Sequence, residues 1–101
     1  MDSGIDLGKM INQIRKERQL TLKSVAQKLE IDLTMLSKIE NGERQVQAHM
    51  IKPLSELFKI DYKELQMEFL NQKIEREYGD DPLIIETIET YLNRKKRALN
   101  K

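Results

Sequence analysis

The feature that most constrains the fold is a pair of short segments with helical apolar spacing, residues 20–29 and 33–41, joined by only "EID". Helices of this length are marginal in water unless tertiary packing stabilises them. Two helices joined by so short a turn can lie near right angles, so that the second enters the DNA major groove while the first crosses the backbone. The positions expected to face inward are Val25, Ala26, Leu29, Leu36 and Ile39.

The rest of the chain also has the spacing of helices. Gly and Pro are scarce, and apolar residues recur three and four positions apart, which predicts an all-α fold. Six helices are expected, over about 7–18, 21–29, 33–41, 48–58 and 61–77, and from Pro82 onward behind an Asp81 cap. Pro53 interrupts the fourth pattern, so that helix either begins only near Met50 or Ile51 or is kinked.

These helices are expected to form two parts. Residues 1–70 are predicted to make a five-helix DNA-binding domain, and residues 71–101 a helical extension for dimerisation or partner contact. The apolar stripe of the extension is either internal core or a dimer seam. Our candidates for a dimer surface are Leu65, Phe69 and Leu70 in the fifth helix, and Ile84, Ile88, Tyr91 and Leu92 in the extension.

Composition gives no support for catalysis or metal binding. The chain has no cysteine and a single histidine, His49, and shows no Gly-rich phosphate loop. We therefore expect no enzyme activity, no metal and no cofactor. No stretch reaches the roughly 18 apolar residues that cross a bilayer, and the N-terminus lacks a signal-peptide pattern. The expected location is cytoplasmic, without membrane contact. Net charge is +1, so a DNA-binding prediction must rest on motif and placement.

The stretch "LTLKSVAQKLEIDLTMLSKIENGER" resembles the helix-turn-helix core of the Cro-and-phage-repressor, or xenobiotic-response-element (XRE), family. The resemblance covers about residues 5–70. Within it, "IDLTMLSKIENGER" is especially similar to the controller proteins of restriction–modification operons. The resemblance implies a five-helix repressor-like fold that binds double-stranded DNA as a homodimer on an inverted repeat. It also implies control of its own promoter and of a neighbouring gene.

The resemblance assigns roles to particular residues. The positions that match base-contacting ones are Leu33, Thr34, Ser37 and Lys38, and those that match phosphate-contacting ones are Thr21, Leu22, Lys23, Asn41 and Arg44. Arg15 and Glu40 match an ion pair that is expected to be partly buried and to tie the first helix to the recognition helix. Leucine replaces the family's common glutamine at Leu22 and the controllers' common arginine at Leu33. Glu30 stands where the turn often has glycine.

Two rival functions remain open at this point. The chain could be an antitoxin-type protein whose extension binds a neighbouring gene product, with DNA binding secondary. It could also be an adaptor whose helix-turn-helix no longer binds DNA, which Leu22 and the nearly neutral net charge of +1 slightly favour.

Overall fold

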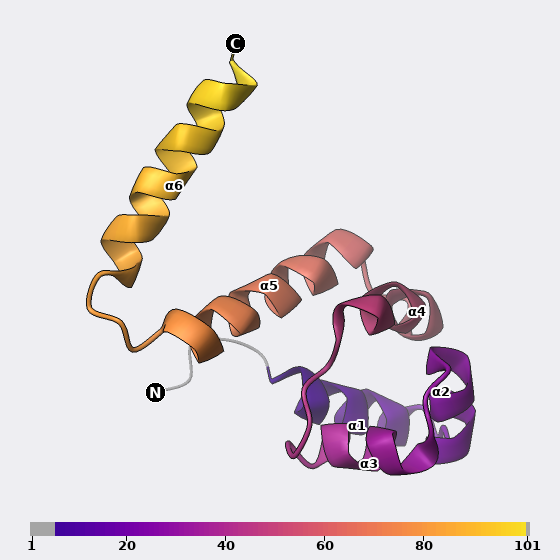
Figure 1. The fold of residues 1–101 in the computed structure, drawn as a ribbon. Coiled ribbons are helices and arrows are strands. Elements are labelled where there is room, and N and C mark those ends of the chain that lie inside the picture. The colour runs from indigo at the N-terminus through magenta and orange to yellow at the C-terminus, as the bar shows by residue number, and fades with distance from the viewer. Residues whose placement is uncertain (1–5, 101) are drawn as a thin grey trace.

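The computed structural model describes residues 6–100, and over that range the chain is helical with no strand (Figure 1). The six helices are α1 (Leu7–Glu17), α2 (Leu22–Leu29), α3 (Leu33–Glu40), α4 (Ala48–Phe58), α5 (Tyr62–Tyr78) and α6 (Ile84–Leu99). The all-α prediction is therefore confirmed. The first five residues of the expected 1–70 domain lie outside the described residues.

A single apolar core lies among α1–α5. Its members are Leu7, Ile11, Val25, Ala26, Leu29, Leu36, Ile39, Met50, Ile51, Leu54, Phe58 and Leu65. All five predicted inward residues of α2 and α3 belong to it. Each aliphatic or aromatic side chain removed from water in this way contributes about 1.5–3 kcal/mol. Because α2 and α3 are only eight residues long, this shared core, rather than intrinsic helix propensity, stabilises them.

Side-chain caps fix where four helices begin. The Asp6, Thr21, Asp32 and Asp61 side chains accept hydrogen bonds from backbone N–H groups in the first turns of α1, α2, α3 and α5. The shortest of these bonds joins Met35 N to Asp32 Oδ1 at 2.7 Å. A cap of this kind is worth about 1 kcal/mol, and here the caps fix the register of α2 and α3.

The starts of α4 and α6 can be compared with the sequence expectations. α4 spans Ala48–Phe58, the expected range, and continues through Pro53, so of the two alternatives for Pro53 the late start near Met50 or Ile51 is wrong. α6 begins at Ile84, not at Pro82. The Asp81 side chain accepts a hydrogen bond from Leu83 N at 2.9 Å, and Asp81 O accepts one from Ile84 N at 3.1 Å. These bonds close a turn ahead of the helix instead of capping it.

The expected boundary at residue 70 falls inside α5, which is continuous to Tyr78. The chain changes direction over residues 79–83, and α6 then projects away from the other helices (Figure 1). The radius of gyration is 16.0 Å, whereas a compact domain of this length has about 13 Å. The molecule therefore consists of a packed α1–α5 unit with α6 standing apart from it.

Candidate nucleic-acid interface

The turn between α2 and α3 sets their relative orientation. Glu30 takes the left-handed conformation, with φ 58° and ψ 41°. Ile31 N donates to Ala26 O at 3.0 Å, and Glu30 N donates to Gln27 O at 3.1 Å, the bond pattern of a Schellman motif. Glycine would take this conformation without steric cost, whereas a side chain there costs about 1–2 kcal/mol.

The outward face of α3 carries the side chains expected to contact bases. Leu33 and Thr34 are exposed, and Ser37 and Lys38 are half-buried. Leu36 and Ile39 are buried on the opposite side of the helix, against the core. The core therefore fixes which face of α3 turns outward, and the four predicted base-contacting residues lie on it or at its edge.

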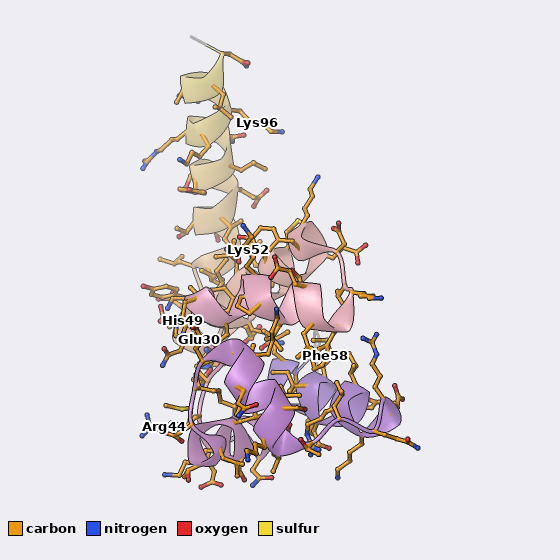
Figure 2. All side chains as sticks on the ribbon, turned by 90° about the vertical axis from the view of Figure 1, so that its right-hand side faces the viewer. Glu30, Arg44, His49, Lys52, Phe58 and Lys96 are labelled. Carbon is orange, nitrogen blue, oxygen red and sulfur yellow. The ribbon has the colours of Figure 1, made fainter. Side chains whose placement is uncertain are left out.

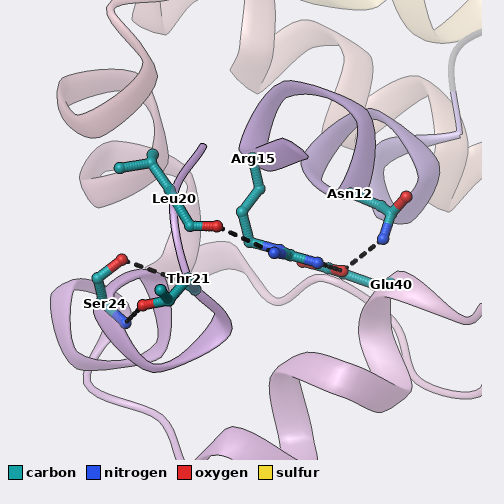
Figure 3. Close-up of polar contacts among 6 residues, drawn as sticks. All are labelled: Asn12, Arg15, Leu20, Thr21, Ser24 and Glu40. Carbon is teal, nitrogen blue, oxygen red and sulfur yellow. Dashed lines mark hydrogen bonds and ion pairs between the residues drawn. The ribbon is translucent and has the colours of Figure 1, made fainter. Parts of the chain in front are cut away.

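The start of α2 is a second part of the surface. Thr21 Oγ1 accepts a hydrogen bond from Ser24 N, and Ser24 Oγ donates to Thr21 O, both at 3.0 Å (Figure 3). Leu22 is half-buried and packs against the core, so its backbone N–H, not its side chain, is the group suited to an anion. Lys23 beside it is exposed. A helix N-terminus of this kind favours negatively charged ligands such as phosphate.

The end of α3 places a third set of polar groups. Gly42 has a φ of +83°, and both Glu43 N and Arg44 N donate to Lys38 O, at 2.8 and 3.2 Å. This tight reversal holds Arg44 directly beyond α3. The Asn41 and Arg44 side chains are exposed, and Arg44 lies at the edge of the molecule in Figure 2.

A hydrogen-bonded ion pair lies behind this surface. Arg15 Nε and Nη2 donate to the two carboxylate oxygens of Glu40 at 2.8 and 3.0 Å. The side chains are only 12% and 4% exposed. The hydrogen bond to Glu40, opposed by burial and helped by the charge of the carboxylate, raises the pKa of Arg15. The two residues that the family resemblance pairs are thus in direct contact, and they join α1 to the end of α3.

Sequence reasoning missed the other members of this network. Asn12 Nδ2 donates to Glu40 Oε1 at 2.7 Å, and Arg15 Nη1 donates to the backbone carbonyl of Leu20 at 3.0 Å (Figure 3). Asn12 lies three residues before Arg15, on the same face of α1, and this spacing is the signal that could have found it. Through Leu20 the network also holds the chain segment that leads into α2.

Gly8 is a further positioning residue that sequence reasoning missed. It is buried in α1, and a Cβ at this position would collide with the carbonyl oxygen of Ile39 in α3. Only glycine allows α1 and α3 to approach so closely, and this approach fixes the position of the recognition helix.

The surface carries charges of both signs. Lys23, Lys38 and Arg44 are basic, whereas the N-cap of α3 is Asp32 and the residue before Arg44 is Glu43. The interface therefore differs from a broad basic patch, and affinity for a nucleic acid depends on individually placed contacts. In residues 6–100, no three His, Cys, Asp or Glu side chains lie close enough together to bind a metal ion. No helix in that range is long and apolar enough to cross a bilayer.

The expected dimer residues fall into different environments. Leu65 is only 2% exposed, so it belongs to the core and has no surface for a second chain to cover; we withdraw it as a dimer contact. Phe69 is half-buried against the core. Leu70, Ile88, Tyr91 and Leu92 are exposed, and Ile84 is half-buried.

Comparison with known families agrees with this geometry. A family model described as a helix-turn-helix domain matches residues 8–78, so the chain belongs to that family. The match supports the XRE-type assignment and reaches through α5 to its last residue. The family is one of DNA-binding regulatory domains rather than of enzymes, which makes the chain a DNA-binding regulator by class. Neither the curated proteins nor the solved structures gave a match.

Proposed function

We propose that this chain is a transcriptional regulator that binds duplex DNA sequence-specifically as a homodimer. Each α3 occupies one of two successive major grooves, about 34 Å apart, on an inverted repeat. The observation that carries the proposal is the position of the outward face of α3. α3 follows the start of α2 and precedes the segment that ends at Arg44, the two elements that we assign to phosphate, and the Arg15–Glu40 pair joins it to α1.

Four side chains of α3 read the bases. Lys38 donates to guanine O6 and N7, and Thr34 and Ser37 offer hydroxyl groups to base edges. Leu33 is 46% exposed at the first position of the helix. An apolar side chain there suits the methyl group of thymine, where controller proteins that carry arginine would contact a base by hydrogen bonds. The operator is therefore expected to differ from those of such relatives at this position.

Phosphate contacts set the register of the protein on the duplex. We assign them to the first-turn amides of α2 near Thr21 and Leu22, to Lys23, and to Asn41 and Arg44. These contacts carry affinity and salt dependence but no sequence information.

The regulated genes are proposed from sequence similarity. The resemblance of "IDLTMLSKIENGER" to controller proteins supports binding at the chain's own promoter, with a neighbouring restriction gene under the same control. This role predicts an inverted repeat upstream of the chain's own coding sequence.

Selection of binding sites from a randomised duplex pool tests the function whatever the sequence of the operator. The expected product is one inverted repeat whose half-site centres are about 10 base pairs apart. Lys38→Ala should weaken the free energy of DNA binding by about 1–3 kcal/mol and relax selection at one base position. Arg44→Ala should weaken binding to all sequences and reduce the salt slope by about 1.

Lys52→Ala is the matched control for charge. Lys52 is exposed on α4 and lies well away from Arg44 (Figure 2), so its removal should leave both affinity and selected sequence unchanged. A pool that gains no consensus after selection would contradict sequence-specific binding and favour the adaptor or antitoxin-type function.

A further inference from the structure

α6 has two sharply different faces and no cover within residues 6–100. All of its residues except Ile84 are exposed. At 100° per residue, one face gathers the apolar side chains, which are Ile84, Ile85, Ile88, Tyr91, Leu92 and Leu99. The opposite face is polar throughout. Ile85 is 68% exposed, Tyr91 60% and Leu99 81%. Because most of the stability of a helix in a protein comes from packing of its apolar face, this exposed stripe of α6 is suited to a partner.

The exposed stripe continues onto α5. Met67, Leu70, Ile74 and Tyr78 are exposed and follow one another at helical spacing. Ile74 lines a cleft together with Ile84, Ile85 and Ile88, at whose edge Glu68, Asn71 and Glu75 also lie, so apolar residues of the two helices meet at the bend between them. An exposed apolar surface that spans two helices is a mark of a protein interaction site.

Charge along α6 decides which partner fits. The first half of the helix carries Glu86 and Glu89, whereas the second half carries Arg94, Lys95, Lys96 and Arg97. A second copy laid antiparallel brings the acidic half of each helix against the basic half of the other. A parallel copy would bring like charges together. The antiparallel arrangement also opposes the two helix dipoles.

Lys95 adds a second reason for this orientation. It lies within the apolar stripe, and its Nζ is 5.8 Å from the centroid of the Tyr91 ring. In a parallel pair in register, two Lys95 side chains would meet in the seam. In an antiparallel pair, each faces the acidic half of the other helix. A single lysine in such a seam is a known device for fixing the arrangement of paired helices.

We propose that α6 pairs antiparallel with α6 of a second copy of this chain, with the exposed side of α5 extending the contact. Glu89 and Lys96 are seven residues apart, so they share one edge of the stripe. Two-fold symmetry between antiparallel helices sets each edge against the same edge of the other. Glu89 therefore faces Lys96 of the second copy. The inference rests on the homodimer of the proposed function but is independent of its DNA contacts.

Charge reversal tests the pairing by sedimentation without DNA. The unchanged protein is expected to be a dimer. The variants Glu89→Lys and Lys96→Glu should each dissociate to monomer at the same concentration. An equimolar mixture of the two variants should restore a dimer that contains one copy of each. A monomeric unchanged protein, or variants that dimerise as well as it does, would overturn the proposal.

Two measurements keep this result interpretable. Far-UV circular dichroism of each variant should show that the helix content of the α1–α5 unit is retained, because α6 makes no part of its core. DNA-site selection is read separately. An unchanged protein that selects a sequence while it is monomeric, or variants that stay dimeric and still select one, would reject the α6 pairing alone, whereas a dimer that selects no sequence would reject the DNA function alone.

Crosslinking determines the orientation, because the chain has no cysteine of its own. Ile85→Cys and Leu99→Cys place thiols near opposite ends of α6, at exposed positions. With a short bifunctional maleimide, an antiparallel pair should crosslink the mixture of the two variants and neither variant alone. Crosslinking of each variant alone would show a parallel pair and overturn the proposal. Lys52→Cys, on α4, is the control that should remain uncrosslinked.

Discussion

The α1–α5 unit and α6 are built from the same kind of sequence, yet their apolar residues have opposite environments. In α4, Met50, Ile51 and Leu54 are at most 1% exposed. In α6, Ile88 is 40% exposed, and the other large apolar residues of the stripe except Ile84 are more exposed still. The periodicity of a helix predicts which face is apolar. It does not specify what covers that face, because this depends on elements elsewhere in the chain or in another molecule.

The largest expected difference between the two regions is in monomer stability. Phe58→Ala should lower the free energy of unfolding by about 3–5 kcal/mol, because it leaves a cavity in the core. Leu92→Ala in α6 should change it by about 0.5 kcal/mol or less when the protein is dilute enough to be monomeric. Urea unfolding followed by circular dichroism measures both. Equal losses would mean that α6 packs against the domain in solution.

Ion pairs give a second contrast of the same form. Glu40→Gln should destabilise the protein by about 3–5 kcal/mol, because Arg15 would remain buried without its charged partner. The pair of Lys73 and Glu77 on α5 is exposed, with 3.7 Å between Nζ and Oε1. Glu77→Gln should therefore cost less than about 1 kcal/mol. The two variants are compared by the shifts of their urea unfolding midpoints, provided that the slope of unfolding free energy against urea is unchanged. Similar midpoint shifts would contradict the buried role of Glu40.

The buried pair should also resist change in pH. The pKa of Arg15 is raised in the folded protein. The stability that this shift contributes is therefore fully present below the pKa of Arg15 in the unfolded state, and it is lost only as pH rises through the pKa of Arg15 in the folded state. Both values are strongly alkaline. Arg15 should therefore add no pH dependence to stability around neutrality. A stability difference between the unchanged protein and Arg15→Gln that varies between about pH 6 and 9 would contradict this.

Substitutions at two glycines distinguish the cost of steric crowding, at Gly8, from the cost of backbone strain, at Gly42. Gly8→Ala should cost about 1–3 kcal/mol, because its new methyl group forces α1 away from Ile39. It should also weaken DNA binding, since α3 is displaced. Gly42 has open space around it, so Gly42→Ala should cost about 1–2 kcal/mol from its positive φ alone. If Gly42→Asn recovers part of that loss, strain is the cause. Gly8→Asn should recover nothing.

The last expected effect is a gain in stability. Glu30→Gly should raise the free energy of unfolding by about 1 kcal/mol, because glycine takes the left-handed turn conformation without steric cost. Lys59 has the same backbone conformation at the end of α4, and Lys59→Gly is the matched variant outside the interface. A loss of stability in both variants would show that the left-handed positions are not strained.

Much of the fold was predictable from local signals. Thr21, Asp32 and Asp61 cap helices as their residue types and spacing predict, and Gly42 takes the left-handed conformation just after the end of α3. The inward face of α3 followed from its apolar spacing. These features depend on residues within one turn of each other, which is why a single sequence is enough to find them.

The features that escaped prediction depend on distant residues. Gly8 matters because Ile39 passes beside it, and Asn12 matters because Glu40 reaches back across 28 positions. Leu65 was misassigned to a dimer surface because periodicity shows that a residue is apolar, but not which neighbour covers it. The Arg15–Glu40 pair is also distant in sequence, and family resemblance rather than spacing predicted it.

Sequence-specific reading by α3 is best tested by fluorescence-anisotropy titration of the protein onto duplex DNA from upstream of its own coding sequence, against a scrambled duplex, at about 50 and 200 mM salt. We expect an affinity ratio of about 10³ or more that persists at the higher salt. We also expect Lys38→Ala to reduce the ratio and Lys52→Ala to leave it unchanged. Equal affinities for the two duplexes, both falling steeply with salt, would show backbone contacts alone and contradict base reading by α3.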